Sequence, residues 1–351
     1  MLESLNWPSV LSTLVMGEDL DADSTAWAME EILSGNATSA QIAGFAVALR
    51  AKGETLAEVQ GLVDSMYRHA TPLTVEGRVI DIVGTGGDRA KTVNISTMSA
   101  VVIAGAGARV VKHGNRAASS ASGSADVLEQ LGVRLDVPPA RIASILDQVG
   151  ITFCFAPVFH SSFRFTAVPR RELGIPTTFN FLGPLTNPAR PQAMAVGVTD
   201  SRMAPIMAGV FAARGADALV FRGDDGLDEI TTTTTTSVWI ADGSTGEVTQ
   251  TALDPQSFGL SYSTPDALRG GDVAFNAKAF ARILDGEKSA VRDAVLLNAA
   301  AGLVAHEGVS GDLDEHMTFA IERATESIDS GAARRVLDTW TEATQRATAD
   351  L

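Results

Sequence analysis

The sequence has a single cysteine, Cys154, few aromatic residues and no long apolar run. One cysteine cannot form a disulfide within the chain, and it excludes a zinc site built on several cysteines. No apolar stretch reaches the roughly 18–20 residues that a membrane-spanning helix needs. Residues 1–7 contain no basic segment followed by an apolar one, so no signal peptide is visible and we expect a cytoplasmic protein.

Positive charge is also scarce, with 27 Lys and Arg against 42 Asp and Glu and a formal net charge of −15 at pH 7. Nucleic acids and anionic membranes require a dominant basic surface, so we expect neither as a main partner. A chain of 351 residues is long for one hydrophobic core, which favours two structural units. The 32 glycines and the low aromatic content favour an α/β protein with many tight turns.

Residues 1–73 have the pattern of a small all-helical domain. The Asp-Ser pair at 23–24 precedes an amphipathic stretch that stops at Gly35. Segments 38–41 (Thr-Ser-Ala-Gln) and 55–58 (Thr-Leu-Ala-Glu) resemble capping boxes, in which a Thr side chain and a Gln or Glu side chain satisfy the first backbone N–H groups of a helix. The expected helices are 27–33, 41–53 and 59–67.

From residue 74 to 351, short β-branched runs alternate with helical patterns. This alternation predicts a larger α/β domain with a mainly parallel central sheet covered by helices. We expect part of 165–190 to join the helical domain in space. The six threonines at 231–236 favour a strand because they are β-branched, although they suggest no specific role. The expected strands are 79–83, 110–112, 194–198 and 218–221, and the expected helices are 96–108, 124–131, 204–213, 293–305 and 317–327.

Two glycine-rich segments, 84–88 and 112–116, have the composition of a site for a phosphorylated sugar. Glycine lets backbone N–H groups approach a phosphate, while Lys and Arg supply charge. From 88 to 116 the chain carries five Lys or Arg and one Asp, a local balance of +4 in an acidic protein. An anionic ligand is the natural explanation. If Ser96 opens a helix, its free N–H groups also favour phosphate.

Each segment has a second interpretation when it is taken alone. The glycines at 84–88 match neither a Walker loop nor a dinucleotide fingerprint and are also typical of a tight turn. His113 fits a structural, hydrogen-bonded histidine as well as a ligand contact. The acidic segment 224–229 fits either a site for a hard divalent cation or a solvated loop. Arg170 fits either a carboxylate ligand or a surface ion pair with Glu172.

The order of these segments closely resembles the anthranilate phosphoribosyltransferase family. That family has a small helical domain and a larger α/β domain, and its fold is similar to that of the pyrimidine nucleoside phosphorylases. The likeness extends over nearly the whole chain. The segments that carry it are 84–88, 94–97, 112–116, 122–126, 170–172, 180–188, 225–229 and 292–300.

The resemblance implies the ligands and the residues that bind them. It implies that no side chain acts as a nucleophile and that catalysis relies on positioning and electrostatics. Anthranilate is expected at Gly84, Asn115 and Arg170, with His160 as a weaker candidate. Mg²⁺, at two ions per monomer, is expected at Ser96, Asp228 and Glu229. Phosphoribosyl pyrophosphate is expected at Gly84, Gly87, Asp88, Thr92, Asn94, Ile95, Ser96, Thr97, Lys112, His113, Gly114, Asn115, Arg116, Ala117, Ala118, Ser119, Ser120 and Ser124.

Three positions depart from the family pattern. Arg89 stands where the family often has glycine, Ala121 replaces a frequent lysine, and Pro169 before Arg170 is unusual. A pyrimidine nucleoside phosphorylase-like enzyme and a nucleic-acid-binding relative of the same fold are the alternatives. The acidic pair Asp228–Glu229 speaks against both, and the net charge of −15 against the second. A homodimer formed through the helical domain is what the resemblance suggests.

Overall fold

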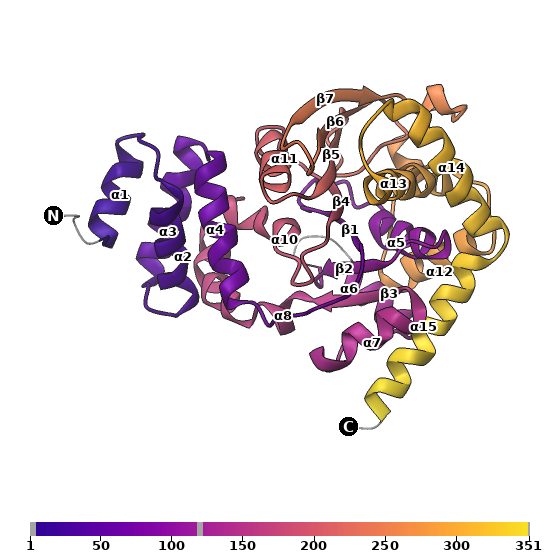
Figure 1. Cartoon of the computed structure of the whole chain (residues 1–351), viewed down its shortest axis with the longest axis horizontal. Helices are drawn as coiled ribbons and strands as arrows, with labels where there is room; N and C mark the ends of the chain where they lie inside the picture. The colour runs from indigo at the N-terminus through magenta and orange to yellow at the C-terminus, as the bar shows by residue number, and fades with distance from the viewer. Residues whose placement is uncertain (1–4, 118–121, 350–351) are drawn as a thin grey trace. The chain divides into compact units, whose positions relative to one another are not determined.

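The computed structural model describes residues 5–117 and 122–349 (Figure 1). The chain divides into two compact units, one made of Met1–Pro72 with Ala156–Pro188 and the other of Leu73–Phe155 with Ala189–Leu351. The first is called the helical unit below and the second the α/β unit. Within the described ranges no helix is long and apolar enough to span a membrane.

The helical unit takes its helix boundaries from side-chain caps. The hydroxyls of Thr38 and Thr55 accept hydrogen bonds from the N–H groups of Gln41 and Glu58, so both expected capping boxes are confirmed. The helix expected at 27–33 begins five residues earlier, at Ala22, and the Asp-Ser pair at 23–24 lies inside it, because Asp21 caps the helix. The elements are α1 (Trp7–Val15), α2 (Ala22–Leu33), α3 (Ser39–Lys52), α4 (Leu56–His69), α8 (Ala156–Phe159), η1 (Ser161–Thr166), α9 (Ala167–Leu173), η2 (Thr178–Asn180) and α10 (Leu182–Leu185).

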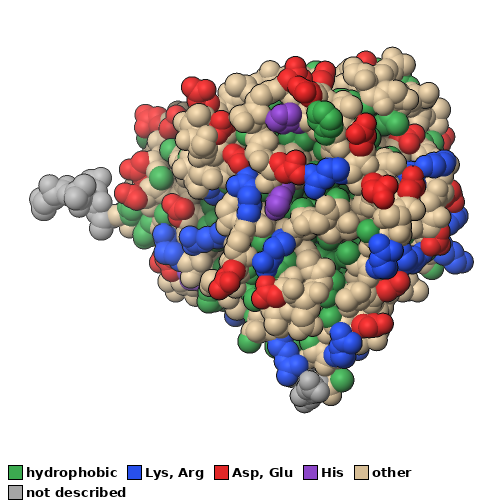
Figure 2. Space-filling model, turned by 45° about the vertical axis from the view of Figure 1, so that its right-hand side comes forward, with side chains coloured by type: hydrophobic (Ala, Val, Ile, Leu, Met, Phe, Trp, Pro, Cys, Tyr) green, Lys and Arg blue, Asp and Glu red, His purple; other side chains and the backbone are tan. Residues whose placement is uncertain are grey.

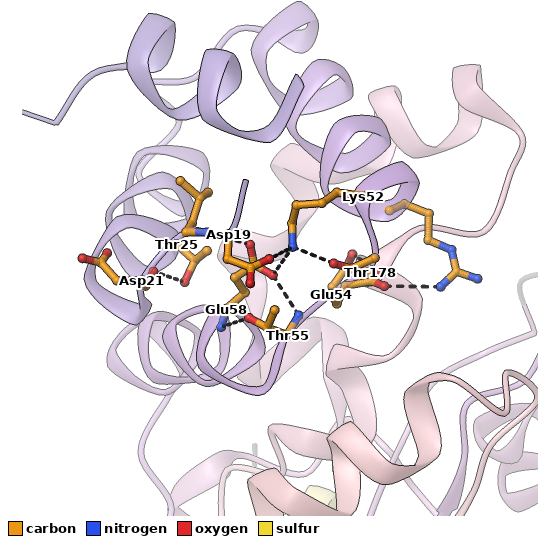
Figure 3. A network of polar contacts seen from close by, with 11 residues as sticks. Asp19, Asp21, Thr25, Lys52, Glu54, Thr55, Glu58 and Thr178 are labelled. Atoms are coloured by element: carbon orange, nitrogen blue, oxygen red, sulfur yellow. Dashed lines mark hydrogen bonds and ion pairs between the residues drawn. The ribbon is translucent and has the colours of Figure 1, made fainter. Parts of the chain in front are cut away.

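A buried ionic network joins the two chain segments of this unit (Figure 3). The Lys52 ammonium, whose side chain is 4% exposed, lies 2.7 Å from Asp19 and 2.9 Å from Glu58. Glu54 accepts a hydrogen bond of 2.6 Å from the Thr178 hydroxyl on the returning segment. Buried charges are tolerated only when they are paired and hydrogen-bonded, and this network meets that condition.

The α/β unit is built on one seven-stranded sheet in the order β3-β2-β1-β4-β5-β6-β7 (Figure 1). The first five strands run parallel, whereas β6 pairs antiparallel with both β5 and β7. The expected fold class, a small helical domain and a larger α/β domain with a mainly parallel sheet, is therefore confirmed. The strands are β1 (Ile80–Gly84), β2 (Val110–Gly114), β3 (Ile151–Phe155), β4 (Ala193–Gly197), β5 (Asp217–Gly223), β6 (Thr236–Ala241) and β7 (Val248–Leu253).

Helices cover this sheet and pack closely on one another. The long helix α13 packs against β1, β4, β5 and α5, and α11 packs against β5 and β6. Helices α5 and α15 approach so closely that a Cβ on Gly105 would lie 2.7 Å from the backbone nitrogen of Ala333. The helices of this unit are α5 (Ile95–Gly105), α6 (Ser124–Gln130), α7 (Pro139–Val149), α11 (Met203–Ala213), α12 (Val273–Leu284), α13 (Ala290–Glu307), α14 (Leu313–Asp329) and α15 (Ala332–Ala349), with short turns η3 (Pro255–Phe258) and η4 (Pro265–Leu268).

Candidate active site

The loops that follow β1, β4 and β5 meet where these parallel strands end. Gly84 of β1 and Gly197 of β4 are directly paired, and Asp228 lies against both. A Cβ on Gly84 would overlap the Asp228 carboxylate, and one on Gly197 would overlap its backbone carbonyl. The Gly86 N–H donates a hydrogen bond of 2.7 Å to Asp228 Oδ2. The first glycine segment and the acidic segment, 142 residues apart, therefore form one structure.

The N-terminus of α5 has no side-chain cap. The helix begins at Ile95, one residue before the expected start, and Asn94 is its N-cap residue. The Asn94 side chain makes no capping hydrogen bond, and its amide instead donates to the Ser122 carbonyl at 3.1 Å. The Thr97 hydroxyl in the first turn is buried and has no hydrogen-bond partner among the described residues. An uncapped helix N-terminus with such a hydroxyl suits an anion such as a diphosphate.

Lys112 is the buried cation of the site. It lies on β2, is 1% exposed, and its ammonium donates to the Ile82 carbonyl at 2.6 Å and to the Ser96 hydroxyl at 3.4 Å. Burial lowers its pKa to about 8, against the opposing attraction of Asp81 and Glu229. Burial deprives this ammonium of the water that would stabilise its positive charge. A bound anion would stabilise that charge in place of water.

In the folded chain, the excess positive charge of residues 88–116 is partly neutralised by carboxylates from other segments. Arg109 pairs with Asp147, and Arg116 pairs with Asp126 and Glu129, all of which lie outside that segment. The expected cationic island was therefore overestimated, because folding brings in carboxylates from later in the chain. On the face of the molecule shown in Figure 2, basic and acidic side chains are interspersed rather than gathered by sign.

Asp126 closes the loop that carries the serine-rich segment. Its Oδ2 accepts hydrogen bonds from the N–H groups of Ala117 and Gly123, at 3.1 and 2.9 Å. A Cβ on Gly123 would overlap the backbone nitrogen of Ala117, so only glycine fits there. The expected site residues Ala118, Ser119 and Ser120 lie outside the described residues, while Ser124 opens α6.

Asp228 and Glu229 are buried carboxylates placed side by side. Burial, together with the nearby Asp88 carboxyl, raises the pKa of Asp228 to about 7, even though the Gly86 N–H opposes this rise. Burial and the neighbouring Asp228 raise the pKa of Glu229 well above its usual range, with Lys112 opposing. Two crowded carboxylates of this kind are stabilised by a cation.

These carboxylates fit Mg²⁺ bound together with a substrate. The Oε2 atom of Glu229 is buried and has no hydrogen-bond partner within the described part of the chain. Residues 5–117 and 122–349 contain no cluster of three or more His, Cys, Asp or Glu that is able to hold a metal alone. Mg²⁺ is usually bound by one or two carboxylates, waters and substrate phosphates, so these two carboxylates suffice.

The expectation of a strand at 231–236 was wrong, since only Thr236 belongs to one. The Thr231 hydroxyl donates to Asp225 Oδ2 at 2.7 Å, and the Thr233 hydroxyl donates to the same oxygen. The Thr235 hydroxyl donates to Asp224 at 2.5 Å. Side-chain hydrogen bonds therefore override the strand propensity of threonine and hold the acidic segment in place.

Two expected ligand residues belong to the helical unit. The guanidinium of Arg170 lies 5.3 Å from the centre of the Phe163 ring, and burial lowers its pKa. His160 is buried, its Nε2 is hydrogen-bonded to the Thr186 carbonyl at 2.8 Å, and burial lowers its pKa. The contact with Thr186 gives His160 a structural role. Arg170 keeps the planar, charged group that recognises a carboxylate.

The segment between the two glycine-rich loops has a strained backbone. Arg89 and Lys91 have φ angles of 61° and 56°, in the left-handed region that L side chains rarely adopt. This explains why a glycine suits position 89. The Lys91 carbonyl accepts a hydrogen bond of 2.8 Å from Gly270, which holds the strained conformation.

Sequence reasoning missed one group of residues near the site, namely Gly270, Gly271 and Asn276. Asn276 is buried and donates a hydrogen bond of 2.9 Å to the Asn94 side chain. Its only sequence signal is a Gly-Gly-Asp turn before a helix, which is typical of many helix starts.

Comparisons with known proteins extend over the same two units. Residues 8–70 match the helical bundle domain of a glycosyl transferase family, and residues 76–334 match the a/b domain of that family. The chain is 65% identical over 340 residues to an anthranilate phosphoribosyltransferase of Nocardioides sp., covering 97% of this chain and 99% of that protein.

Solved structures resemble the chain over almost its whole length. The anthranilate phosphoribosyltransferase of Thermus thermophilus superposes with a TM-score of 0.89 at 37% identity, covering 96% of this chain and 99% of the other. The enzyme of that name from Saccharomyces cerevisiae, in complex with PRPP and Mg, superposes with a TM-score of 0.87 at 27% identity, covering 97% and 98%.

Proposed function

Because this chain belongs to the anthranilate phosphoribosyltransferase family, we propose that it transfers the phosphoribosyl group of 5-phosphoribosyl 1-pyrophosphate to the amine of anthranilate. The products are N-(5-phosphoribosyl)anthranilate and pyrophosphate, and the reaction belongs to tryptophan biosynthesis. The observation that carries this proposal is the contact of Asp228 with Gly84, Gly86 and Gly197. It sets a carboxylate suited to Mg²⁺ against the loop suited to a phosphorylated sugar.

We assign the substrates to the residues expected from the sequence. Phosphoribosyl pyrophosphate is assigned to the loops 84–97 and 112–124, which include the uncapped α5 N-terminus and buried Lys112. Anthranilate is assigned to Gly84, Asn115 and Arg170. Two Mg²⁺ ions per monomer are assigned to Ser96, Asp228 and Glu229, where they supply positive charge to the departing pyrophosphate.

The reaction breaks the bond from the ribose C1 to the pyrophosphate oxygen and forms a bond from C1 to the anthranilate nitrogen. The bonding electrons leave with the pyrophosphate, and the amine releases one proton as its nitrogen becomes bonded to carbon. Lys112, the Ser96 N–H and the Thr97 hydroxyl at the start of α5 stabilise the negative charge that grows on the leaving oxygens. They are already in place, so little reorganisation opposes the step.

The chain needs no nucleophilic side chain for this chemistry. Anthranilate carries a neutral aromatic amine with a free lone pair, so no strong base is required to start the attack. Arg170 binds the carboxylate and Asn115 the ring or amine, and together they orient the nitrogen toward C1. Most of the acceleration then comes from positioning and electrostatics.

A cytoplasmic homodimer that associates through the helical unit is part of this proposal. The helical unit exposes large apolar side chains, among them Val15 at 78% and Met16 at 66%. Exposed apolar side chains of this size favour a protein partner over water. Light scattering of the purified protein gives its mass in solution, and a mass of one chain contradicts this part.

The decisive experiment follows the fluorescence of anthranilate after mixing with the purified protein, Mg²⁺ and phosphoribosyl pyrophosphate. We expect a loss of fluorescence that requires all three components and stops with a chelator. The Asp228→Asn variant should lose most of the rate. A parallel assay with inorganic phosphate and a pyrimidine nucleoside tests the phosphorylase alternative. Release of the free base there, with no consumption of anthranilate, contradicts the proposed function.

A further inference from the structure

Asn276 on α12 is a buried amide that the proposed mechanism does not use. It is 2% exposed, and its Oδ1 accepts a hydrogen bond of 2.9 Å from the Gly271 N–H. Its Nδ2 donates a hydrogen bond of 2.9 Å to Oδ1 of Asn94, 182 residues earlier in the chain. A side chain from the C-terminal half of the chain therefore sets the position of Asn94, the N-cap residue of α5.

The two amides form a relay whose direction is fixed at both ends. It starts at the Gly271 N–H, passes through Asn276 and Asn94, and ends at the Ser122 carbonyl, which accepts from Asn94 Nδ2 at 3.1 Å. A backbone N–H only donates and a backbone carbonyl only accepts. A 180° flip of either side-chain amide, which exchanges its oxygen and nitrogen, would therefore break two hydrogen bonds. The relay therefore fixes the orientation of the Asn94 side chain.

This orientation has a consequence for α5. An asparagine at the N-cap position normally accepts a hydrogen bond from an N–H group of the first turn. Here Asn94 Oδ1 faces Asn276, and α5 has no side-chain cap. The Ile95 N–H donates to the Val93 carbonyl at 2.8 Å and the Thr97 N–H donates to the Asn94 carbonyl at 3.1 Å. Among the described residues, the Ser96 N–H and the buried Thr97 hydroxyl are left for another acceptor.

The segment before α12 supports the same arrangement. The Gly270 N–H donates to the Lys91 carbonyl at 2.8 Å, and the Val93 N–H donates to the Leu268 carbonyl at 3.0 Å. A Cβ on Gly270 would lie 2.7 Å from the Thr92 carbonyl oxygen and 2.9 Å from Asn276 Oδ1. Glycine at 270 thus allows the chain before α12 to pack directly on the chain before α5.

We propose that Asn276 is a positioning residue for the diphosphate of phosphoribosyl pyrophosphate. By holding Asn94, it keeps the α5 N-terminus uncapped for the diphosphate and keeps the Asn94 amide on the Ser122 carbonyl. The inference rests on the proposed function of the site and adds a residue to it. Without Asn276, Asn94 turns to cap α5, and the anion must displace that cap before it binds.

The direct test measures binding rather than turnover. Isothermal titration of the protein with phosphoribosyl pyrophosphate and Mg²⁺, without anthranilate, gives the Kd for wild type and for Asn276→Leu, which keeps the branching and the number of heavy atoms of the side chain. We expect Asn276→Leu to raise this Kd by about tenfold or more, in the range seen when a residue that orients a ligand-binding group is lost. In steady-state assays the KM for the sugar donor should rise, while the KM for anthranilate changes less than about threefold.

A control variant separates positioning from stability. The buried Ser327 hydroxyl donates to the Val102 carbonyl at 2.8 Å, toward the other end of α5. Ser327→Ala also removes a buried hydrogen bond to α5 and lowers the melting temperature, but it should leave the Kd unchanged. Should Asn276→Leu fail to fold, the smaller and polar Asn276→Ser takes its place in the same measurements.

A double-mutant cycle tests whether Asn276 acts through Asn94. In an Asn94→Ala background, Asn276→Leu should no longer weaken binding, because the side chain that it releases is absent. Equal effects of Asn276→Leu in both backgrounds, or an unchanged Kd in the single variant, overturn the inference. A wild-type protein that does not bind the sugar donor contradicts the proposed function itself, a result separate from either of these.

Discussion

Gly197 and Asp228 are packed so closely that the backbone carbonyl of Asp228 occupies the space where a Cβ of residue 197 would be. Gly84, paired with Gly197 in the sheet, has the Asp228 carboxylate in the same position. Asp228 fits against these two neighbouring strands because residues 84 and 197 have no side chains. Gly197, which is assigned no contact with a substrate, becomes essential by this route.

Gly197→Ala should therefore act as an active-site mutation. The added methyl group displaces Asp228, so we expect kcat/KM to fall at least about tenfold and the free energy of unfolding to drop by about 1–3 kcal/mol. Gly44→Ala in α3 is the matched control, because a Cβ at this position would meet only Leu11 of α1, at 3.6 Å. That variant should keep full activity and be slightly stabilised by the helix propensity of alanine. An active, stable Gly197→Ala protein contradicts the packing argument.

Arg89 should tolerate glycine better than a β-branched residue. Its φ of 61° is strained for any L side chain, and glycine removes that strain at the cost of a more flexible unfolded chain. We expect Arg89→Gly to change the free energy of unfolding by less than about 0.5 kcal/mol, whereas Arg89→Val lowers it by about 1–2 kcal/mol. Urea denaturation measures both. Equal effects of the two substitutions would show that the backbone conformation differs.

Arg170→Ala should raise the KM for anthranilate far more than that for the sugar donor. The lost guanidinium is assigned to the carboxylate, and removing one partner of a charged, partly buried contact typically weakens binding by about 10- to 100-fold. The neighbouring Arg171 is exposed, so Arg171→Ala is the control and should leave both KM values nearly unchanged. Parallel increases in the two KM values for Arg170→Ala count against the assignment.

Asp126→Asn should destabilise the protein in a way that depends on pH. Burial raises the pKa of Asp126, but hydrogen bonds from Ala117, Gly123 and Arg116 outweigh it and leave the pKa below its usual value. A carboxyl whose pKa is lower in the folded state stabilises that state above the unfolded pKa of about 4, and this contribution is lost as pH falls through the folded pKa. We expect a loss of about 1–2 kcal/mol at pH 7.

Urea denaturation of wild type and Asp126→Asn between pH 7 and pH 3 provides the measurement. The difference in the free energy of unfolding should be constant down to about pH 4 and shrink below it. A difference that stays the same at pH 3 would show that the lost contribution does not come from the ionised carboxylate.

Local signals account for what the sequence predicted well. The capping boxes at Thr38 and Thr55 and the β1 run before Gly84 depend only on neighbouring residues, and the structure contains all three. The threonine run failed because its hydroxyls bond to Asp224 and Asp225, which lie up to 11 residues earlier. Strand propensity describes the backbone alone and does not anticipate such bonds.

Long-range contacts account for what the sequence did not predict. Arg109 forms an ion pair with a carboxylate 38 residues away, and Arg116 forms ion pairs with carboxylates 10 and 13 residues away. Asn276 reaches Asn94 over 182 residues, and no local pattern marks either as a partner of the other. The order of several short segments predicts the site residues, whereas the groups that orient them depend on the fold.

The helical unit takes its last piece, Ala156–Pro188, from the middle of the chain. During translation, α1 to α4 leave the ribosome first, yet Thr178, the hydrogen-bond partner of Glu54, has not been synthesised. The nascent N-terminal helices therefore remain partly exposed to solvent while β1 to β3 are synthesised. A single cut after Pro72 would leave the N-terminal fragment without Ala156–Pro188, and the other fragment would carry that segment without the helices it packs on, so neither unit is obtained on its own by this truncation.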